Sequence, residues 1–239
     1  MFKTINNCLK FKHTIFTENC LFCLGGIKNS HLSICSPCLE NLPFQPQNSC
    51  PQCGLAAIQG EMCGHCLKST PAFDRTHALF RYQYPINTLL QRYKYGNQLD
   101  IATVLGQLLS KSVSSSVLPD VLIPMPLHPQ RLQERGFNQA VEITRVVACE
   151  LKLSMDVSAC KRVKSSAPQV TLPLKERVRN MRNAFSCERA LDNLKVALLD
   201  DVMTTGASLN ALAAAVKKAG AAHVECWVIA RTQPGMSHV

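Results

Sequence analysis

The pattern of apolar and polar positions changes near residue 70 of this 239-residue chain. Before that point cysteines, prolines and polar residues alternate without a helical period. After it, short apolar runs typical of buried strands separate stretches in which apolar residues recur every three or four positions, as in amphipathic helices. We therefore predict two domains, comprising residues 1–70 and 71–239.

Strands and helices are predicted to alternate in the second domain. The expected strands are 78–84, 121–126, 195–199 and 224–230, and the expected helices are 99–113, 138–151 and 207–221. Asn138 is suited to cap the start of one helix, and Gly220 is suited to end the last. Because parallel strands are joined by crossover helices, this order predicts an α/β fold with a mostly parallel sheet flanked by helices on both faces.

Charge narrows the class of partner. The chain has 26 Lys and Arg against 16 Asp and Glu, which gives a net charge of +10. Such an excess favours an anionic partner, either nucleic acid or a phosphate compound. No apolar run approaches the roughly 18 residues of a membrane-spanning helix, and the start of the chain lacks the apolar stretch of a secretory signal. We expect a protein without membrane insertion, located in the cytoplasm.

The cysteines predict metal sites. Of 13 cysteines, nine lie in the first 66 residues, and an odd total without a secretory signal argues against a disulfide framework. Each Cys-x-x-Cys pair presents two thiolates from one tight turn, and two such pairs complete a tetrahedral zinc site. The four pairs are Cys20 and Cys23, Cys35 and Cys38, Cys50 and Cys53, and Cys63 and Cys66.

Eight thiolates indicate two structural zinc sites, sorted most simply in sequence order. A crossed arrangement satisfies the same spacing, and iron–sulfur ligation or redox pairs are the other chemistries of such cysteines. His65, inside the last pair, is an alternative ligand to one thiolate. Because residues 20–66 offer little apolar core, bound metal would supply folding energy directly.

The run VALLDDVMTTGAS, residues 196–208, joins an apolar strand to two acids and then to a loop that enters a helix. Ligands of parallel sheets bind at the carboxyl edge, where this strand ends. Asp200 and Asp201 can accept hydrogen bonds there from the diol of a sugar. The amides and hydroxyls of 204–208 lie at the positive end of the helix and form an anion cradle, in which Gly206 lets the backbone approach a phosphate closely.

This run resembles the phosphoribosyl pyrophosphate (PRPP) motif of type I phosphoribosyltransferases. The resemblance implies that the two acids hold the ribose hydroxyls and that the loop holds the 5′-phosphate. Magnesium would bridge the pyrophosphate and the ribose hydroxyls. The residues of the run that are expected to bind PRPP are Asp200, Asp201, Val202, Met203, Thr204, Thr205, Gly206, Ala207 and Ser208.

Two basic stretches complete the expected site. Arg131 and Arg135, shortly before the helix start at Asn138, are expected to meet the pyrophosphate, because a guanidinium offers a planar fork of donors. The stretch 160–185 is predicted to form a loop that closes over the site and excludes water. A solvated basic segment is the alternative for both stretches.

The order of the motifs resembles that of the ComF competence family. Two cysteine-rich ribbons precede RYKYGNQLDIA, PLHPQRLQERGFNQA and LLDDVMTTGAS, and the likeness extends roughly over residues 18–232. The stretch RGFNQ, residues 135–139, is its most specific part. The resemblance implies a type I phosphoribosyltransferase fold with an N-terminal double zinc ribbon. It also implies a role in natural transformation, the uptake of single-stranded DNA into the bacterial cytoplasm.

All four tyrosines of the chain lie within 14 residues, with basic residues between them. Aromatic rings stack on unpaired bases while cations follow the phosphates. Packing of the tyrosines against the core is the alternative. The residues predicted to bind single-stranded DNA are Tyr82, Tyr84, Arg92, Tyr93, Lys94 and Tyr95.

Together these patterns predict a PRPP-binding competence protein that handles incoming single-stranded DNA, with a DNA-uptake helicase or recombination proteins as candidate partners. The alternative is a metabolic phosphoribosyltransferase. In that enzyme Asp200 and Asp201 would be the catalytic residues, orienting the sugar while phosphoribosyl passes from PRPP to a nitrogen base or an amide and pyrophosphate leaves. A regulator that senses PRPP without reacting it is the third possibility.

Overall fold

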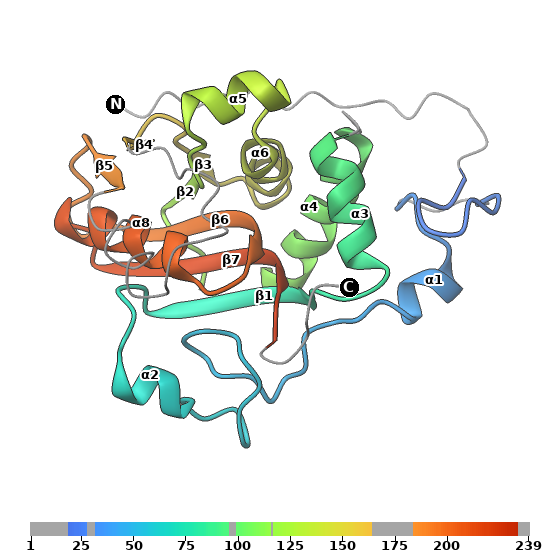
Figure 1. Cartoon of the computed structure of the whole chain (residues 1–239), viewed down its shortest axis with the longest axis horizontal. Coiled ribbons are helices and arrows are strands. Elements are labelled where there is room, and N and C mark those ends of the chain that lie inside the picture. Colours follow the sequence, from blue (N-terminus) through green and yellow to red (C-terminus); the bar gives the residue numbers. More distant parts are fainter. Residues whose placement is uncertain (1–18, 28–31, 96–98, 116, 164–183, 234–239) are drawn as a thin grey trace, which may run out of the picture.

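Five parallel strands form the central sheet of the computed structural model, which describes residues 19–27, 32–95, 99–115, 117–163 and 184–233 (Figure 1). Every neighbouring pair of strands is parallel. All carboxyl ends therefore meet at one edge of the sheet, and the predicted parallel α/β fold is confirmed. The strand order is β1 (Arg75–Arg81), β7 (His223–Arg231), β6 (Lys195–Met203), β2 (Val121–Pro124) and β3 (Ser154–Met155).

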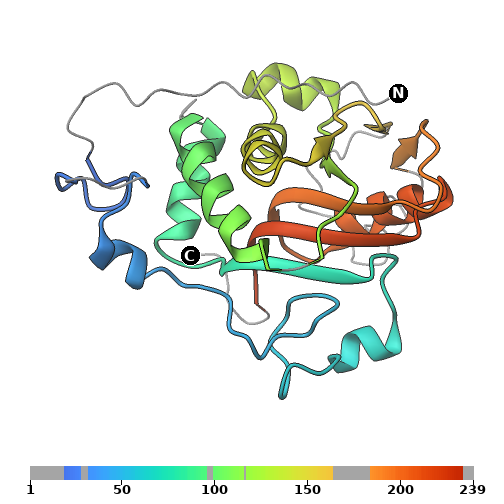
Figure 2. The same ribbon diagram turned by 180° about the vertical axis from the view of Figure 1, so that it is seen from behind.

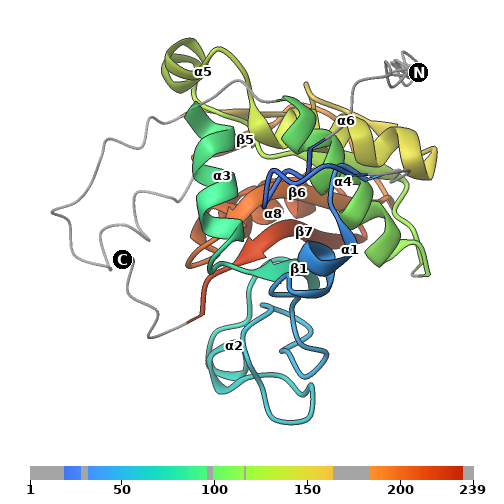
Figure 3. The ribbon, with the colours of Figure 1, turned by 90° about the vertical axis from the view of Figure 1, so that its right-hand side faces the viewer.

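Elements pack on both faces of this sheet. The first face is covered by α3 (Ile86–Tyr95), α4 (Leu99–Val113) and α6 (Gln139–Leu151), which lie together in Figure 3. The other face is covered by α8 (Ala207–Lys218) and by the antiparallel pair β4 (Cys160–Arg162) and β5 (Phe185–Cys187).

The alternation of side chains along β6 explains the two layers. Val196 and Leu198 are buried in the core beneath α8, whereas Ala197 and Leu199 are buried beneath the helices of the first face. Successive side chains of a strand point to opposite faces, so a strand covered on both sides is apolar at every position. This is why the sequence reads as a continuous apolar run.

The predicted elements of the second domain are present with shifted ends. The helix α4 has its predicted bounds, and the Asn138 side chain caps α6 by accepting hydrogen bonds from the backbone N–H groups of Ala140 and Val141. The helices α3 and α5 (Pro129–Arg135) were not predicted. No helix in the described part of the chain combines the length and apolarity that crossing a bilayer requires.

The cysteine-rich segment forms two small units. The first contains α1 (Ser36–Glu40), and its residues Leu21, Ile34 and Leu42 join the core of the first face of the sheet. The second ends in α2 (Gly64–Lys68) and lies along β1, as the view from behind shows (Figure 2). The two units therefore attach to different parts of the sheet domain.

Candidate metal centres and phosphoribosyl site

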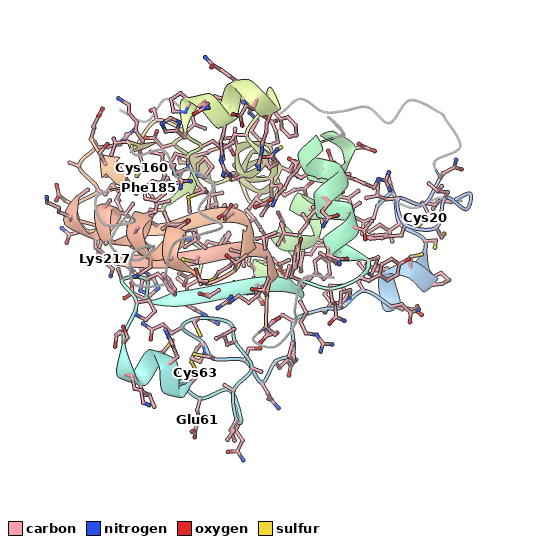
Figure 4. All side chains as sticks on the ribbon, viewed as in Figure 1. Cys20, Glu61, Cys63, Cys160, Phe185 and Lys217 are labelled. Atoms are coloured by element: carbon pink, nitrogen blue, oxygen red, sulfur yellow. The ribbon has the colours of Figure 1, made fainter. Side chains whose placement is uncertain are left out.

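Eight cysteines form two clusters, and within each cluster the sulfur atoms all lie within 4.8 Å of one another. The pairs are grouped in sequence order and are not crossed. In Figure 4, Cys20 lies beside α1 and Cys63 lies beneath β1. The first cluster consists of Cys20, Cys23, Cys35 and Cys38, and the second cluster consists of Cys50, Cys53, Cys63 and Cys66.

The spacing of the sulfur atoms fits zinc. Tetrahedral coordination with Zn–S bonds of about 2.3 Å places the sulfur atoms about 3.8 Å apart. The Sγ atoms of Cys23 and Cys35 are 3.7 Å apart, and those of Cys53 and Cys63 are 3.5 Å apart. In the second cluster, three of the four cysteines are themselves the buried core of the unit. Bound metal would therefore stabilise the fold of the second unit, as an apolar core does in a larger domain.

Backbone amides favour the thiolate form of the first cysteine in each cluster. Burial raises the pKa of the Cys20 thiol, but the N–H groups of Cys23 and Cys35 outweigh that effect and lower the pKa to about 6. The corresponding amides lower the pKa of Cys50 to about 7, again against burial. The hydrogen bond with Cys35 raises the pKa of Cys38 to about 12, and burial raises the pKa of Cys53 to about 11. Sulfur atoms this close together therefore ionise together only around a cation, as in a closed, structural zinc site.

The two acids of the PRPP-like motif lie within β6 and not after it, because the strand continues to Met203 instead of ending at residue 199. Neighbouring residues of a strand point to opposite faces. Asp201 accordingly faces α3, where its Oδ2 lies 2.8 Å from Nζ of Lys94, and its side chain is 13% exposed. Asp200 is partly exposed and lies on the same side of β6 as Val196 and Leu198, which face α8.

The two carboxylates influence each other. Burial, followed by the charge of Asp201, raises the pKa of Asp200 well above its ordinary value, while the Asp201 N–H and the Lys94 charge act in the opposite direction. The Asp201 N–H donates to Oδ1 of Asp200 at 2.9 Å. Two repelling carboxylates at a strand end are an arrangement that sugar hydroxyls or a divalent cation relieve.

The loop after β6 is open to solvent. Thr204 and Thr205 are exposed, and Gly206 begins α8 with a φ of 80°. Because side chains rarely adopt this φ, the turn favours glycine, and a Cβ at Gly206 would also displace Cε of Met203, which lies 2.7 Å from that position. Of the other motif residues, Met203 is buried, and Val202, Ala207 and Ser208 are half-buried. The loop therefore presents exposed amides and hydroxyls at a helix N-terminus, as an anion site requires.

Arg131 and Arg135 both lie on α5, at the carboxyl edge of the sheet. Arg135 donates through Nη1 to Oε1 of Gln139 at 3.2 Å, so its guanidinium is held at the start of α6. A third arginine, Arg162 of β4, lies near Arg131. Burial lowers the pKa of Arg162, the charge of Arg131 lowers it further, and the charge of Asp200 raises it. The three charged groups therefore share one region.

Arg162 is the residue of the predicted basic loop that the structure brings to the acids. Its Nε is buried and has no hydrogen-bond partner within the described ranges, and its guanidinium lies 5.5 Å from the centre of the Phe185 ring. Lys161 points elsewhere and pairs with Glu188 at 2.7 Å. The rest of the predicted closing loop, residues 164–183, lies outside the described residues.

The structure corrects one of the predicted DNA contacts and places a second in an ion pair. Tyr93 is wholly buried and donates its hydroxyl to the carbonyl oxygen of Gln139 at 3.1 Å, so its ring is part of the core and cannot stack on a base. Lys94 is paired with Asp201, one of the two acids of the PRPP-like motif. Helical periodicity places the two residues on the inner side of α3.

The remaining predicted DNA contacts have different surroundings. The Tyr84 side chain is 77% exposed, and Arg92 is also exposed. Tyr82 is half-buried against the core of the first face. The side chain of Tyr95 lies outside the described residues.

A buried cation that was not predicted lies between the two sites. Arg231, the last residue of β7, is 3% exposed and donates to backbone carbonyls of both the second cluster and the loop after β6. One signal for it exists in the sequence, because Arg231 directly follows the apolar run 226–230. A charge adjoining a buried strand is rarely left without a specific partner.

Comparison with known proteins agrees with both halves of this description. Residues 11–67 match the double zinc ribbon domain family, and residues 132–236 match the phosphoribosyl transferase domain family. Among solved structures, glutamine PRPP amidotransferase from B. subtilis is 16% identical with a TM-score of 0.40 over 58% of this chain, and the chain spans only 30% of that protein. A purine phosphoribosyltransferase from Pyrococcus horikoshii is 20% identical with a TM-score of 0.31, over 59% of this chain and 91% of that one.

The fold and the clusters thus define a phosphoribosyltransferase-like protein with an N-terminal double zinc ribbon. Competence protein F of Haemophilus influenzae is 33% identical over 227 residues, which cover 90% of this chain and 98% of that protein. DNA utilization protein YhgH of Salmonella typhimurium is 33% identical over 89% of this chain and 96% of its own length. Competence protein ComFC of Streptococcus pneumoniae is 24% identical over 94% and 99%. The chain belongs to the ComF family of competence and DNA utilization proteins.

Proposed function

We propose that this protein binds PRPP with magnesium at the carboxyl end of β6 and handles incoming single-stranded DNA in the bacterial cytoplasm. The names of its relatives, which refer to competence and DNA utilization, support the second half of the proposal. The net charge of +10 suits a polyanionic partner.

One observation carries the PRPP half. Two acids, an exposed Thr-Thr-Gly loop at a helix N-terminus and the Arg131–Arg162 pair lie around the same edge of the sheet. A ribose diol needs acceptors and its phosphates need donors and positive charge, and both are present at this edge. The buried Nε of Arg162, which has no partner in the described part of the chain, is a donor available to such a ligand.

The residues divide the task by chemistry. Asp200 and Asp201 accept hydrogen bonds from the ribose hydroxyls, the loop holds the 5′-phosphate, and Arg131 and Arg162 meet the pyrophosphate. Bound magnesium supplies positive charge against the pyrophosphate and binds best to ionised carboxylates. Lys94 neutralises Asp201 in the absence of ligand. When hydroxyls and the cation satisfy that carboxylate, the Lys94 ammonium can turn to a phosphate oxygen.

Titration calorimetry tests the PRPP half. Asp201→Asn should weaken PRPP binding in the presence of Mg²⁺ at least tenfold, because an amide holds ribose hydroxyls and the cation less well than a carboxylate. Asp192→Asn is the matched control, since Asp192 is an exposed acid that precedes the amino end of β6. Equal affinity in Asp201→Asn and the wild type would contradict the assignment.

The DNA half rests on the surface around the end of β1 and α3. Tyr84 offers an exposed ring, Arg92 an exposed cation, and Tyr82 lies between the core and solvent. Because α3 also carries Lys94, this surface and the PRPP site share one helix. Stacking on each base contributes about 1–3 kcal/mol, so one or two aromatic contacts suffice for weak, salt-sensitive binding.

Fluorescence anisotropy with a labelled oligothymidine tests the DNA half. Tyr84→Ala combined with Arg92→Ala should weaken binding about tenfold or more and flatten its dependence on salt. Arg75→Ala is the control, because Arg75 is an exposed arginine at the other end of β1. An unchanged affinity in the double variant would place the DNA surface elsewhere.

The metabolic alternative is separated by turnover. The same two acids serve a transferase, so an assay of pyrophosphate release from PRPP with a panel of bases and amides decides between the two functions. Release that depends on one such acceptor and is lost in Asp201→Asn favours the enzyme. Binding without release favours the competence protein.

A further inference from the structure

Arg231 connects the second cluster to the loop that follows β6. Its Nε donates to the carbonyl oxygen of Cys53 at 2.8 Å. Its Nη1 donates to the carbonyl oxygen of Met203 at 2.9 Å and to that of Thr204. A single buried guanidinium therefore holds a metal-cluster residue on one side and the first residues of the candidate phosphate loop on the other.

On the cluster side the contact is tight. Gly54 has a φ of 70°, and a Cβ there would lie 3.3 Å from Cγ2 of Thr76 and 3.7 Å from Cγ of Arg231. Thr76 also contacts this turn through two hydrogen bonds. Its N–H donates to the Pro51 carbonyl at 2.9 Å, and its hydroxyl donates to the Gln52 carbonyl at 2.6 Å. The Cys-x-x-Cys turn thus rests directly on β1 and on the Arg231 side chain.

On the loop side the contact sets the direction of the amides. The carbonyl of a trans peptide points opposite to the N–H of the next residue. Because Arg231 draws the carbonyls of Met203 and Thr204 toward itself, the N–H groups of Thr204 and Thr205 are directed away from it. Thr232 reinforces this orientation, since its N–H donates to the Met203 carbonyl at 3.1 Å and its hydroxyl to the Thr204 carbonyl at 3.2 Å.

The charge of Arg231 suits the cluster. Among the described residues the hydrogen-bond partners of its guanidinium are all carbonyl oxygens, and a buried cation without a nearby anion is costly. Four thiolates around one Zn²⁺ carry a net charge of about −2. The filled second cluster therefore stabilises Arg231 in its buried position, which in turn fixes the loop.

We propose that Arg231 is a positioning residue that couples the second cluster to the phosphate loop, so that metal in the second cluster, and not in the first, maintains the PRPP-binding geometry. The first cluster is the internal control, because its unit packs on the core of the first face and not on Arg231. This inference rests on the proposed binding of PRPP, but its effect on the loop is measurable without ligand.

The experiment uses two pairs of matched variants in the full chain. Cys63→Ser and Cys35→Ser remove equivalent ligands, since each residue precedes a short helix and donates its N–H to the first sulfur of its cluster at 3.4 Å. Arg231→Met removes the bridging guanidinium, and Arg145→Met removes an exposed arginine of α6. Zinc is counted with a chelating dye, and hydrogen exchange of residues 203–208 is followed by mass spectrometry.

Cys63→Ser and Arg231→Met should each accelerate exchange in the loop about tenfold and weaken PRPP binding with Mg²⁺ about tenfold, as expected when charge-assisted hydrogen bonds are lost. Cys35→Ser and Arg145→Met should leave both within twofold of the wild type. The double variant Cys63→Ser with Arg231→Met should be no weaker than either single variant, because the two act through one connection.

The coupling is overturned if Cys63→Ser loses one zinc equivalent while exchange in the loop stays at the wild-type rate. Additive effects in the double variant overturn it as well. Should Arg231→Met fail to fold, Thr232→Val removes one bond to the Thr204 carbonyl and should shift exchange in the same direction. If the wild type does not bind PRPP, the proposed function fails, and the exchange measurements alone still decide the coupling.

Discussion

Asp200→Asn should make the folded protein more stable at neutral pH while removing its affinity for PRPP. The pKa of Asp200 is raised above its ordinary value of 3.8 by burial and then by Asp201. As pH rises above that value, the unfolded chain releases this proton before the folded protein does, so the free energy of unfolding declines with pH until the raised pKa is passed. Asparagine does not titrate, so the variant escapes this decline.

The structure sets the size of the effect. Asp200 is only partly exposed, and the charge of Asp201 repels its carboxylate, while the Lys94 ammonium is already bonded to Asp201. The repulsion from Asp201 is only partly offset by the Asp201 N–H and the Lys94 charge, because the pKa of Asp200 remains raised. Removing an under-compensated charge at a binding site typically raises the free energy of unfolding by about 1–2 kcal/mol. We expect that gain near pH 8 and almost none near pH 4.

Urea unfolding followed by tryptophan fluorescence measures the gain, because Trp227 is the single tryptophan and lies buried in β7 beside β6. Zinc loss at low pH affects the wild type, Asp200→Asn and the control Asp192→Asn alike, so it cancels in their differences. A variant that is less stable than the wild type at pH 8, or a gain that grows toward low pH, would refute the argument that Asp200 is held as a strained binding acid.

Three further predictions follow from single contacts. Lys94→Met should lower the free energy of unfolding by about 2 kcal/mol at neutral pH, because it leaves Asp201 without its cation. That magnitude lies between the values for exposed and buried ion pairs. An unchanged urea midpoint would contradict this prediction. Chelation should release two zinc equivalents and expose residues 20–66 to protease before the sheet domain, and uniform cleavage would count against structural zinc. Gly206→Ala should weaken PRPP binding and lower the free energy of unfolding by about 1–2 kcal/mol. The loss of stability should exceed that of Gly136→Ala, because Gly136 has a φ of 75° but open space where a Cβ would lie. Calorimetry measures PRPP binding and urea unfolding measures the stability of the two variants.

The sequence predicted the layers of the fold because local patterns determine them. The helix α4 and the cap at Asn138 follow from apolar spacing and from a side chain that bonds its own helix start. The strand β6 was predicted too short, because Asp200 and Asp201 read as the end of an apolar run. Their backbone groups nevertheless continue the ladder with β7, and polar side chains are tolerated where a strand reaches the edge of its sheet.

The sequence could not predict which cations reach the two acids and the loop that follows them. Lys94, Arg162 and Arg231 reach the site from α3, β4 and β7, which are far apart in sequence and meet only through the order of the strands. Clustering of Tyr93 and Lys94 with other tyrosines and cations indicated a DNA surface. The helical period instead turns Tyr93 into the core and Lys94 toward Asp201.

The position of the acids between two basic partners has a consequence for how the parts of the protein communicate. Lys94 ties Asp201 to the helix that also carries Arg92, and Arg231 ties the following loop to the second cluster. A sugar phosphate bound as proposed would rearrange the first of these contacts and depend on the second. A ligand that contacts Asp201 would therefore bias α3, and with it the exposed surface beside Tyr84, through the contact between Lys94 and Asp201. A ligand that contacts Arg135 would reach the same helix through Gln139, whose side chain accepts from Arg135 and whose carbonyl oxygen accepts from Tyr93.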